Sequence, residues 1–421
     1  MSKNEKTSQI SGFYKMPIKE RIEIVEKIAG LAKDEAKLFL SCLDMETADR
    51  MIENVLGTFE LPLGIAVNFK INGKDYLVPM AIEESSVVAA ASNAAKIARI
   101  NGGFKTESTK PLMIGQIQIL HIDDVPGAAQ KIIGKKKDIL AFANAQDKIL
   151  VDLGGGAQDI EVRILDSPLG KMIVVHLVVN VLDAMGANAV NTMCEALTPM
   201  LEEISGGKVR LRILSNLADK RIVKAKAVFD KEKMGGEHVV DAFIESYTLA
   251  SVDPYRAATH NKGIMNGIDA LIVATGNDFR AIEAGAHAYA ARNGQYTSLS
   301  KYYKDKNGNL VGELELPMAI GIVGGAGNIH PKAKLCKKIL GIKTAKELGD
   351  VVASLGLAQN FAAVFALSTV GIQKGHMGLH AKNIAVMAGA TGGQIDKVAD
   401  QLVKEGKVRL DRAKEILEEI K

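Results

Sequence analysis

The chain has 421 residues, and its 53 lysine and arginine side chains outnumber its 49 aspartate and glutamate side chains, which gives a net charge of +4. This length predicts about two or three domains of ~150 residues each. With 47% hydrophobic and 24% charged residues, the composition excludes a disordered or fibrous chain. The small net charge and the lack of a dense basic stripe argue against a nucleic-acid-binding protein.

The expected helices and strands fall into three stretches of the chain. Up to residue 109, helices are predicted at 18–31, 34–43, 47–56 and 85–100, with a hairpin at 63–78 that turns at Asn72-Gly73. Between 110 and 215, strands at 112–122, 160–165, 172–182 and 209–214 alternate with helices at 127–146 and 183–204, which predicts a compact α+β domain. After it come helices at 239–251 and 279–292, a strand at 270–274 and an amphipathic helix at 395–420.

The stretch 351–373 carries no charge and is long enough to cross a bilayer. It contains Ser354, Gln359 and Asn360, so a buried core helix is the better prediction. A capping box at 344–347 precedes this helix. Residues 1–7 lack an apolar segment, so we expect no signal peptide, no membrane association and a cytoplasmic protein.

The common chemical signatures are missing. The three cysteines, Cys42, Cys194 and Cys336, are far apart, so neither disulfides nor a zinc site is expected. The glycine runs at Gly154 and Gly325 both fail the dinucleotide-binding pattern at its third glycine, and no P-loop, nucleophile elbow or H-E-x-x-H helix is present. A dinucleotide would therefore have to bind by another route.

Four short segments carry candidate chemistry, each with a simpler structural alternative. Glu84 closes a strand before a helix and is either a helix cap or a general acid. Lys262 lies in a polar run, 260–267, where Gly263 and Gly267 permit tight turns and a loop is expected. It is either a solvated lysine or, with Arg256 in the same loop, part of a pocket for an anion or oxyanion. Asp278 is either an N-cap or the partner of a lysine.

The fourth segment is Lys374–His380, whose two histidines, His376 and His380, are four residues apart without a third metal ligand. Its glycines predict a mobile loop that delivers His376 as an acid. In addition, the turn 183–188 follows a β-branched strand and precedes a helix whose N-terminus would suit phosphates.

These segments resemble the hydroxymethylglutaryl-CoA (HMG-CoA) reductase family, in its soluble prokaryotic (class II) branch. The resemblance covers residues from about 45 to the end. It is carried by the motifs Glu53-Asn-Val-Leu-Gly-Thr-Phe-Glu-Leu-Pro62, Glu84-Ser-Ser, Asp183-Ala-Met-Gly-Ala-Asn188, Arg256-Ala-Ala-Thr-His-Asn-Lys262-Gly, Gly276-Asn-Asp278 and Gly375-His376-Met.

The resemblance implies a reversible four-electron reduction of HMG-CoA to mevalonate and CoA, with two reduced nicotinamide cofactors, through a hemithioacetal and mevaldehyde. Lys262 would stabilise the oxyanion, and Asp278 would hydrogen-bond to Lys262. Glu84 would shuttle a proton, although either Glu84 or Lys262 can be the formal donor. His376 would protonate the CoA thiolate.

The resemblance also implies binding roles, a cofactor preference and an assembly. The implied substrate-binding residues are Ser86, Arg256, Asn216, Asn266, Glu53, Asn54 and Gly57, and the implied cofactor-binding residues are Asp147, Asp183, Met185, Gly186 and Asn188. A carboxylate at Asp147 would favour NADH over NADPH, because it would repel a 2′-phosphate. No metal is implied, and the expected assembly is a homodimer with a shared active site, or a hexamer.

The expected fold is mixed α/β. A large, mostly helical CoA- and substrate-binding domain (1–109 and 216–375) would hold an inserted, non-Rossmann cofactor domain (110–215) and be followed by a helical flap (376–421). Two alternatives remain at this point. An aldehyde-forming acyl-CoA reductase would need a nucleophilic cysteine in a polar loop, and a non-catalytic CoA-binding protein would bind without turnover.

Overall fold

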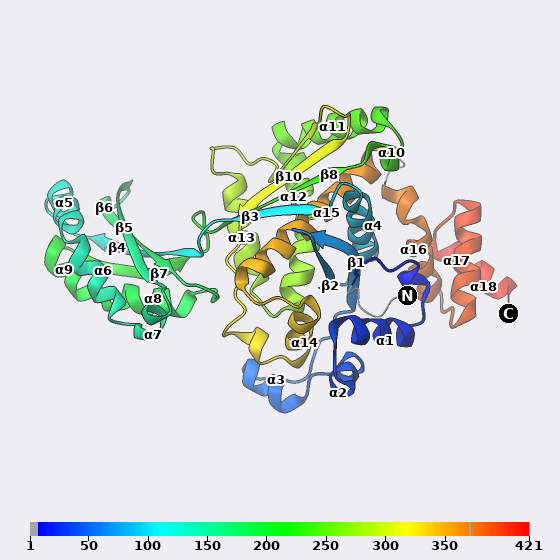
Figure 1. The fold of residues 1–421 in the computed structure, drawn as a ribbon, viewed down its shortest axis with the longest axis horizontal. Helices are drawn as coiled ribbons and strands as arrows, with labels where there is room; N and C mark the ends of the chain where they lie inside the picture. The colour runs from blue at the N-terminus through cyan, green and yellow to red at the C-terminus, as the bar shows by residue number, and fades with distance from the viewer. Residues whose placement is uncertain (1–6, 370–371, 421) are drawn as a thin grey trace.

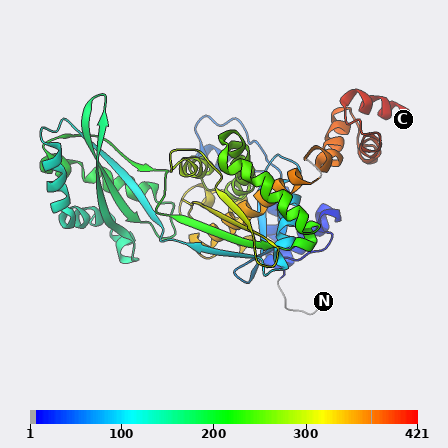
Figure 2. The ribbon, with the colours of Figure 1, turned by 90° about the horizontal axis from the view of Figure 1, so that it is seen from above.

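The computed structural model describes residues 7–369 and 372–420. Two separate β-sheets are surrounded by helices, so the expected mixed α/β fold is confirmed. The four-stranded sheet lies at one end of the elongated molecule, the six-stranded sheet in the middle and a group of three helices at the other end (Figures 1 and 2).

The central sheet has the strand order β2-β1-β3-β8-β10-β9. Its strands are β1 (Leu63–Ile71), β2 (Lys74–Ala81), β3 (Phe104–Ser108), β8 (Ile222–Phe229), β9 (Ser300–Lys304) and β10 (Leu310–Pro317). The predicted hairpin of β1 and β2 is present, and its turn residues Asn72 and Gly73 have positive φ angles of 48° and 87°. All neighbouring strands are antiparallel except β1 and β3.

The helices of the central part come from both sides of residues 110–215 in the sequence. They are α1 (Ile18–Ala29), α2 (Lys33–Lys37), α3 (Met45–Met51), α4 (Val87–Arg99), α10 (Lys231–Met234), α11 (Glu237–Val252), α12 (Pro254–Ala274), α13 (Phe279–Ala290), α14 (Pro331–Leu340) and α15 (Ala345–Ser368), with 3₁₀ turns at Phe13–Lys15, Leu38–Leu40 and Ala326–Asn328. Helix α15 contacts α4, α12 and strands β3, β8 and β10.

Helix α15 contains the long uncharged segment from Val351 up to Ser368. It is long and apolar enough to cross a membrane by length and composition, but two thirds of its most apolar window is buried inside the protein. Thr344 caps it by accepting a hydrogen bond from the Glu347 amide. The prediction of a buried core helix is therefore confirmed.

The second sheet is entirely antiparallel, with the order β5-β6-β4-β7. Its strands and helices are β4 (Leu112–Leu120), α5 (Val125–Gly134), α6 (Lys136–Asn144), α7 (Lys148–Asp152), β5 (Gly156–Ser167), β6 (Gly170–Asn180), α8 (Ala187–Ala196), α9 (Thr198–Ser205) and β7 (Lys208–Ser215). This α+β unit interrupts the central sheet between β3 and β8 in sequence.

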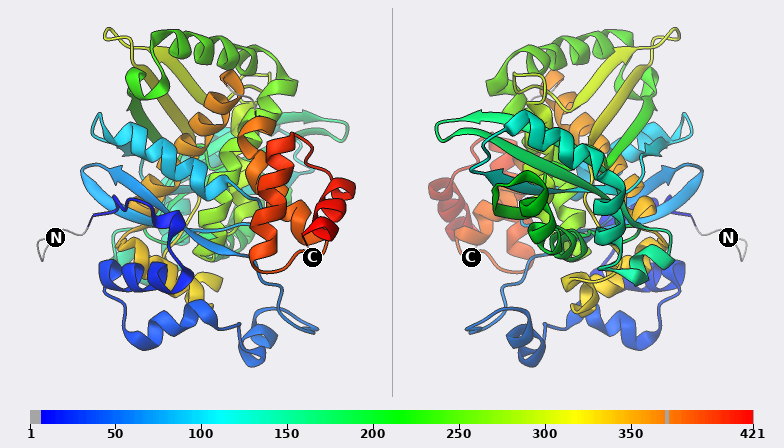
Figure 3. Two further views of the ribbon diagram at one scale, coloured as in Figure 1. Left: turned by 90° about the vertical axis from the view of Figure 1, so that its right-hand side faces the viewer. Right: turned by 90° about the vertical axis from the view of Figure 1, so that its left-hand side faces the viewer.

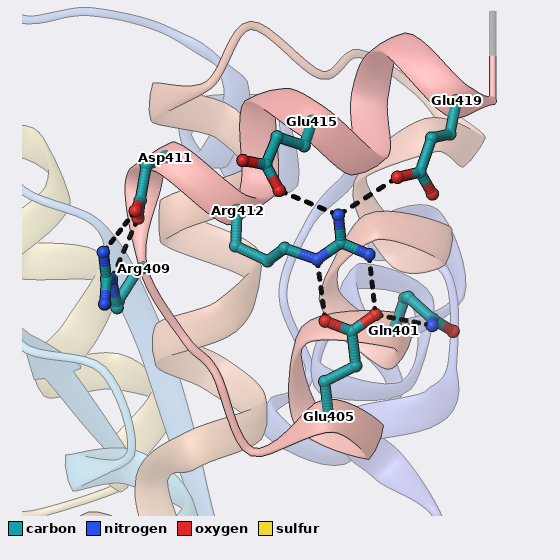
Figure 4. A network of polar contacts seen from close by, with 7 residues as sticks. All are labelled: Gln401, Glu405, Arg409, Asp411, Arg412, Glu415 and Glu419. Carbon is teal, nitrogen blue, oxygen red and sulfur yellow. Dashed lines mark hydrogen bonds and ion pairs between the residues drawn. The ribbon is translucent and has the colours of Figure 1, made fainter.

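The last three helices, α16 (Ile372–Met387), α17 (Gly393–Glu405) and α18 (Leu410–Glu419), pack on one another around their own apolar cluster. They lie beside the central part (Figure 3), which α16 contacts through α15. Arg412 joins α18 to α17 through two hydrogen bonds to Glu405, and Glu415 and Glu419 also accept from it (Figure 4).

Several sequence predictions are wrong in detail. Residues 270–274 are not a strand but the last turns of α12, and the polar run 260–267 is not a loop but the middle of the same helix. The predicted helices 127–146, 183–204 and 395–420 are each two helices. The last of them breaks at Gly406, which has a φ of 64°. The predicted helix 47–56 ends at Met51, and strands β3, β8, β9 and β10 were not predicted.

Candidate active site

Glu84 and Lys262 form an ion pair although they are 178 residues apart in sequence. Glu84 lies between β2 and α4, and Lys262 lies on α12. The Lys262 Nζ is 3.0 Å from Glu84 Oε2, and the Asn266 Nδ2 donates to the same oxygen at 3.2 Å. Lys262 and Asn266 share one face of α12 because they are four residues apart.

The pair is accessible, because the Lys262 and Glu84 side chains are 61% and 43% exposed. An exposed ion pair contributes at most about 1 kcal/mol to stability. This contribution to folding stability is too small to explain the pair, and a role in catalysis explains it better. A lysine and a carboxyl group in contact can stabilise a developing oxyanion and exchange a proton with it.

Ser86, next to this pair, has an unusual backbone and an unpaired hydroxyl. It is the N-cap of α4 with a φ of 75°, a left-handed conformation that is uncommon for serine. Its Oγ is buried and has no hydrogen-bond partner among the described residues. A buried hydroxyl without a partner is costly, so a substrate group that hydrogen-bonds to it would be favoured. Glu84 does not cap α4, so the capping alternative for this residue is wrong.

Asp278 is the N-cap of α13. Its Oδ1 accepts hydrogen bonds from the Arg280 and Ala281 amides, and the Arg280 guanidinium is 3.3 Å away. Among the described residues, no hydrogen bond joins Asp278 to Lys262, so that implied contact stays a prediction. The adjacent Asn277 accepts a hydrogen bond from the Gly321 amide at 2.9 Å.

His260 and Asn261 directly precede Lys262, and their side chains hold this turn of α12 to residues 296–300. His260 Nε2 is 2.7 Å from Ser300 Oγ, and burial lowers the pKa of this histidine to about 3. The Asn261 side chain bonds to Tyr296, Thr297 and Leu299. Their signal in the sequence is a pair of polar residues within an otherwise apolar helix face. At the start of α12, burial also lowers the pKa of Arg256.

The turn 183–188 connects β6 to α8 and lies against the central part. One carboxylate oxygen of Asp183 accepts from the Ala345 amide at the start of α15. Gly186 is the N-cap of α8 with a φ of 102°, and no side chain caps the first turn of α8. The free N–H groups of that turn suit an anion. Asp147 is the N-cap of α7, where it accepts from the Leu150 amide.

Glu53, Asn54 and Gly57 lie in an exposed segment after α3. This segment borders a cavity of about 410 Å³ that also reaches Gly276, two residues before Asp278. Asn216 is exposed just after β7. No group of three metal-ligating side chains occurs within the described residues.

His376 lies in helix α16 and not in the expected loop, and its side chain is outside the described residues. Cys42 is exposed, whereas the other two cysteines are not accessible nucleophiles. Cys194 and Cys336 are buried, and burial raises the pKa of each to about 12. This argues against an acyl-CoA reductase that uses the thiolate of Cys194 or Cys336.

Comparison with known proteins is specific. Residues 17–381 match the hydroxymethylglutaryl-coenzyme A reductase family. A 3-hydroxy-3-methylglutaryl-coenzyme A reductase of Archaeoglobus fulgidus is 59% identical over 416 residues, which cover 99% of this chain and 95% of that protein. A probable enzyme of the same kind from Borreliella burgdorferi is 37% identical over 348 residues, 79% of this chain and 77% of that protein.

The fold comparison agrees. The 3-hydroxy-3-methylglutaryl-coenzyme A reductase of Streptococcus pneumoniae matches with a TM-score of 0.84 at 40% identity and covers 98% of this chain and 99% of its own. A structure of the class II enzyme from that organism, bound to NADPH in open conformations, matches with a TM-score of 0.82 at 41% identity and covers 96% and 100%.

The fold, the acid–lysine pair and these relatives together define an oxidoreductase. The chain belongs to the hydroxymethylglutaryl-coenzyme A reductase family. Its reaction is the reduction of HMG-CoA to mevalonate and CoA.

Proposed function

We propose that this reductase carries out both reduction steps at the Glu84–Lys262 pair, with Asp278 and His376 completing the catalytic set. The observation that carries the proposal is the 3.0 Å contact between Lys262 Nζ and Glu84 Oε2, made by residues from distant parts of the chain and open to a ligand. Asn266 donates a hydrogen bond to the same carboxylate oxygen. It would contact the substrate oxygen when the proton passes from Glu84 to the substrate.

The overall reaction consumes HMG-CoA, two reduced cofactors and two protons, and it yields mevalonate, CoA and two oxidised cofactors. The bound nicotinamide supplies each hydride. Lys262 donates a hydrogen bond to the thioester oxygen as negative charge develops there. The leaving CoA thiolate takes up a proton, the role we give to His376. Glu84, hydrogen-bonded to Lys262, relays a proton from the Lys262 ammonium to the aldehyde oxygen, which becomes the mevalonate hydroxyl, and Lys262 regains a proton from solvent.

The substrate would lie between the Glu84–Lys262 pair and the cavity beside α3. Ser86, Arg256 and Asn216 are proposed for the carboxylate and hydroxyl of the HMG group, which agrees with the unpaired Ser86 Oγ and the half-buried Arg256. Gly57 lines the cavity that would take the CoA arm, and Glu53 and Asn54 lie in the same exposed segment.

The same segment supports the proposed homodimer. Its apolar side chains Leu56 and Phe59 are 99% and 94% exposed in the single chain. Exposed apolar groups beside a site indicate that a partner or a ligand covers them. A second subunit at this place would complete the shared active site.

The cofactor would bind to the α+β unit of residues 110–215, on the turn 183–188 and beside Asp147. The residues present fit an anionic dinucleotide, because the first turn of α8 has no side-chain cap and Gly186 lets the backbone approach closely. Met185 and Asn188 lie on the same turn, where their side chains would contact the nicotinamide end.

NADH is the proposed cofactor, because the Asp147 carboxylate would accept hydrogen bonds from the ribose hydroxyls and repel a 2′-phosphate. The relative from S. pneumoniae was observed with NADPH, so the preference has to be measured on this chain. We expect kcat/KM to be higher with NADH, and Asp147→Ser to reduce the difference. Equal or better use of NADPH by the wild-type protein would contradict the preference.

The experiment that tests the catalytic pair follows the absorbance of the reduced cofactor and the release of CoA, in wild type and in Lys262→Ala. Two cofactors oxidised per CoA, with a rate about 100- to 1000-fold lower in the variant, would support the proposal. Lys301→Ala, an exposed lysine on β9, is the matched control and should keep the wild-type rate. One cofactor per CoA would indicate an aldehyde-forming enzyme, and binding without turnover would indicate a CoA-binding protein.

A further inference from the structure

Arg221 is a buried cation that the proposed chemistry does not use. It directly precedes β8, and only 5% of its surface is exposed. Its guanidinium donates hydrogen bonds to the carbonyls of Ala184 at 3.0 Å, Met185 at 3.5 Å and Ile320 at 2.5 Å. These carbonyls belong to two separate segments, the turn 183–188 and the segment 318–323.

A guanidinium in this place is costly, so its presence calls for a reason. Burial lowers the pKa of Arg221 to about 10, and the charge of Asp183 offsets part of that effect. A planar fork of donors can hold two chain segments at once, whereas a lysine ammonium presents a single point of attachment. The side chain therefore acts as a clamp between the turn and the segment.

The two segments also fit together through their backbones. The Ile322 amide donates to the Asp183 carbonyl at 2.9 Å, and Ala184 forms a parallel bridge with Val323. A Cβ atom at Gly321 would lie 2.5 Å from the Met185 nitrogen. Only glycine permits this approach, so the position of the turn is set closely.

The segment 318–323 also contacts the part of the chain that carries a proposed catalytic residue. The Gly321 amide donates to the side-chain oxygen of Asn277, the neighbour of Asp278. Asp183 in turn accepts from the Ala345 amide at the start of α15, 2.7 Å away. The turn that we propose for the cofactor is thus fixed against the part of the chain that carries Asp278.

We propose that Arg221 is a positioning residue for the cofactor: it holds the turn 183–188 against the segment 318–323 and thereby sets where the nicotinamide lies relative to Glu84 and Lys262. This inference rests on the proposed cofactor role of the turn. Loss of the clamp should weaken cofactor binding and hydride transfer, while HMG-CoA binding, which uses other residues, should persist.

The test compares Arg221→Gln and Arg221→Lys with wild type. The dissociation constants of NADH and of HMG-CoA are measured separately, by fluorescence and by calorimetry, together with kcat and Tm. We expect Arg221→Gln to raise the Kd of NADH by about tenfold or more and to lower kcat, with the Kd of HMG-CoA unchanged. Arg221→Lys, which keeps the charge, should lie between this variant and wild type.

Arg99→Gln is the matched control, because Arg99 is also largely buried but binds Asp75 in the region of β2 and α4. It should lower Tm without changing the Kd of NADH. Gly321→Ala is an independent variant that leaves Arg221 intact and pushes on Met185. It should also weaken NADH selectively, and it tests the clamp even where Arg221→Gln fails to fold.

An unchanged Kd of NADH in both Arg221→Gln and Gly321→Ala, or equal weakening of NADH and HMG-CoA, would overturn the inference. A wild-type protein that binds HMG-CoA but no reduced nicotinamide would overturn the proposed cofactor role itself. The two failures are therefore distinguishable, because the first appears only in the variants and the second appears in the wild-type protein.

Discussion

The His260 imidazole lies two residues before Lys262 and is held neutral beneath it. It is 2% exposed, and its Nε2 is hydrogen-bonded to Ser300 Oγ. Ser300 in turn donates to Asn360 on α15. Burial is the main reason for the low pKa of His260, and the charge of Arg256 lowers this pKa further. Protonation of His260 should therefore weaken the packing that supports the proposed catalytic lysine.

The pKa of His260 falls from its usual 6.5 to about 3 in the folded protein. Between these values the unfolded chain binds a proton that the folded protein does not bind, so stability falls as the pH falls. The expected slope is about 1.4 kcal/mol per pH unit from this residue. Denaturant titrations from about pH 7 to about pH 4 should show that His260→Gln lowers this slope.

The exposed His238 on α11 provides the control for this measurement. His238→Gln should keep the wild-type dependence on pH. The same slope in His260→Gln and in wild type would show that other groups cause the loss of stability in acid.

The sequence could identify the chemical types at the site but not their contacts. Glu84 and Lys262 stand out because each is a polar residue next to turn or helix signals. Their 3.0 Å contact joins β2–α4 to α12 and depends on the whole central packing. Arg221 gave no signal, because an arginine before a strand is ordinarily exposed, and only the fold places three carbonyls around it.

Helix α12 shows how close packing misleads a reading of the sequence. Gly263 and Gly267 suggested turns, but both lie inside the helix and face α15, where a Cβ at Gly267 would be 2.9 Å from the Gln359 Cβ. The following residues 270–274 looked like a strand because the end of a helix buried on all sides is uniformly apolar. A short apolar run does not distinguish the two structures.

Gly267→Ala should destabilise the protein although alanine is the better helix former. The gain in helix propensity is at most about 1 kcal/mol, whereas forcing a methyl group between α12 and α15 costs about 1–3 kcal/mol. The Leu355 carbonyl, 3.2 Å from the new Cβ, cannot move aside as a flexible side chain would. Urea unfolding measures the difference. Gly134→Ala, at the open end of α5, should instead be neutral or stabilising, and the same loss at both glycines would exclude the packing explanation.

At the scale of the whole molecule, the two sheets show which strand pairings local sequence patterns can predict and which they cannot. The alternation in residues 110–215 predicted all four strands of the second sheet, because these strands neighbour each other along the chain. The central sheet instead pairs β3 with β8, which lie on either side of that inserted unit in the sequence, and pairs β1 with β3, which β2 and α4 separate. Strand period gives the face that is buried but not the partner, so this sheet could be assembled only in three dimensions.

The three C-terminal helices have an apolar cluster of their own, separate from the main core. They should therefore be able to lose their structure without unfolding the rest. Leu402 is fully buried in this cluster, and a Leu→Ala change in a core costs about 2–5 kcal/mol. We expect Leu402→Ala to raise hydrogen exchange in α16–α18 while α12 and α15 stay protected. Uniform loss of protection over the chain would show that the molecule unfolds as one unit.

The same variant also bears on function, since α16 carries His376. If these helices form the proposed flap, Leu402→Ala should lower kcat, because protonation of the CoA thiolate slows, and should leave the Kd of NADH unchanged. Leu211→Ala, an exposed leucine on β7, should change neither exchange nor rate. An unchanged kcat in a variant whose C-terminal helices exchange freely would exclude them from the catalytic cycle, and the acid for the thiolate would then have to come from the Glu84–Lys262 pair.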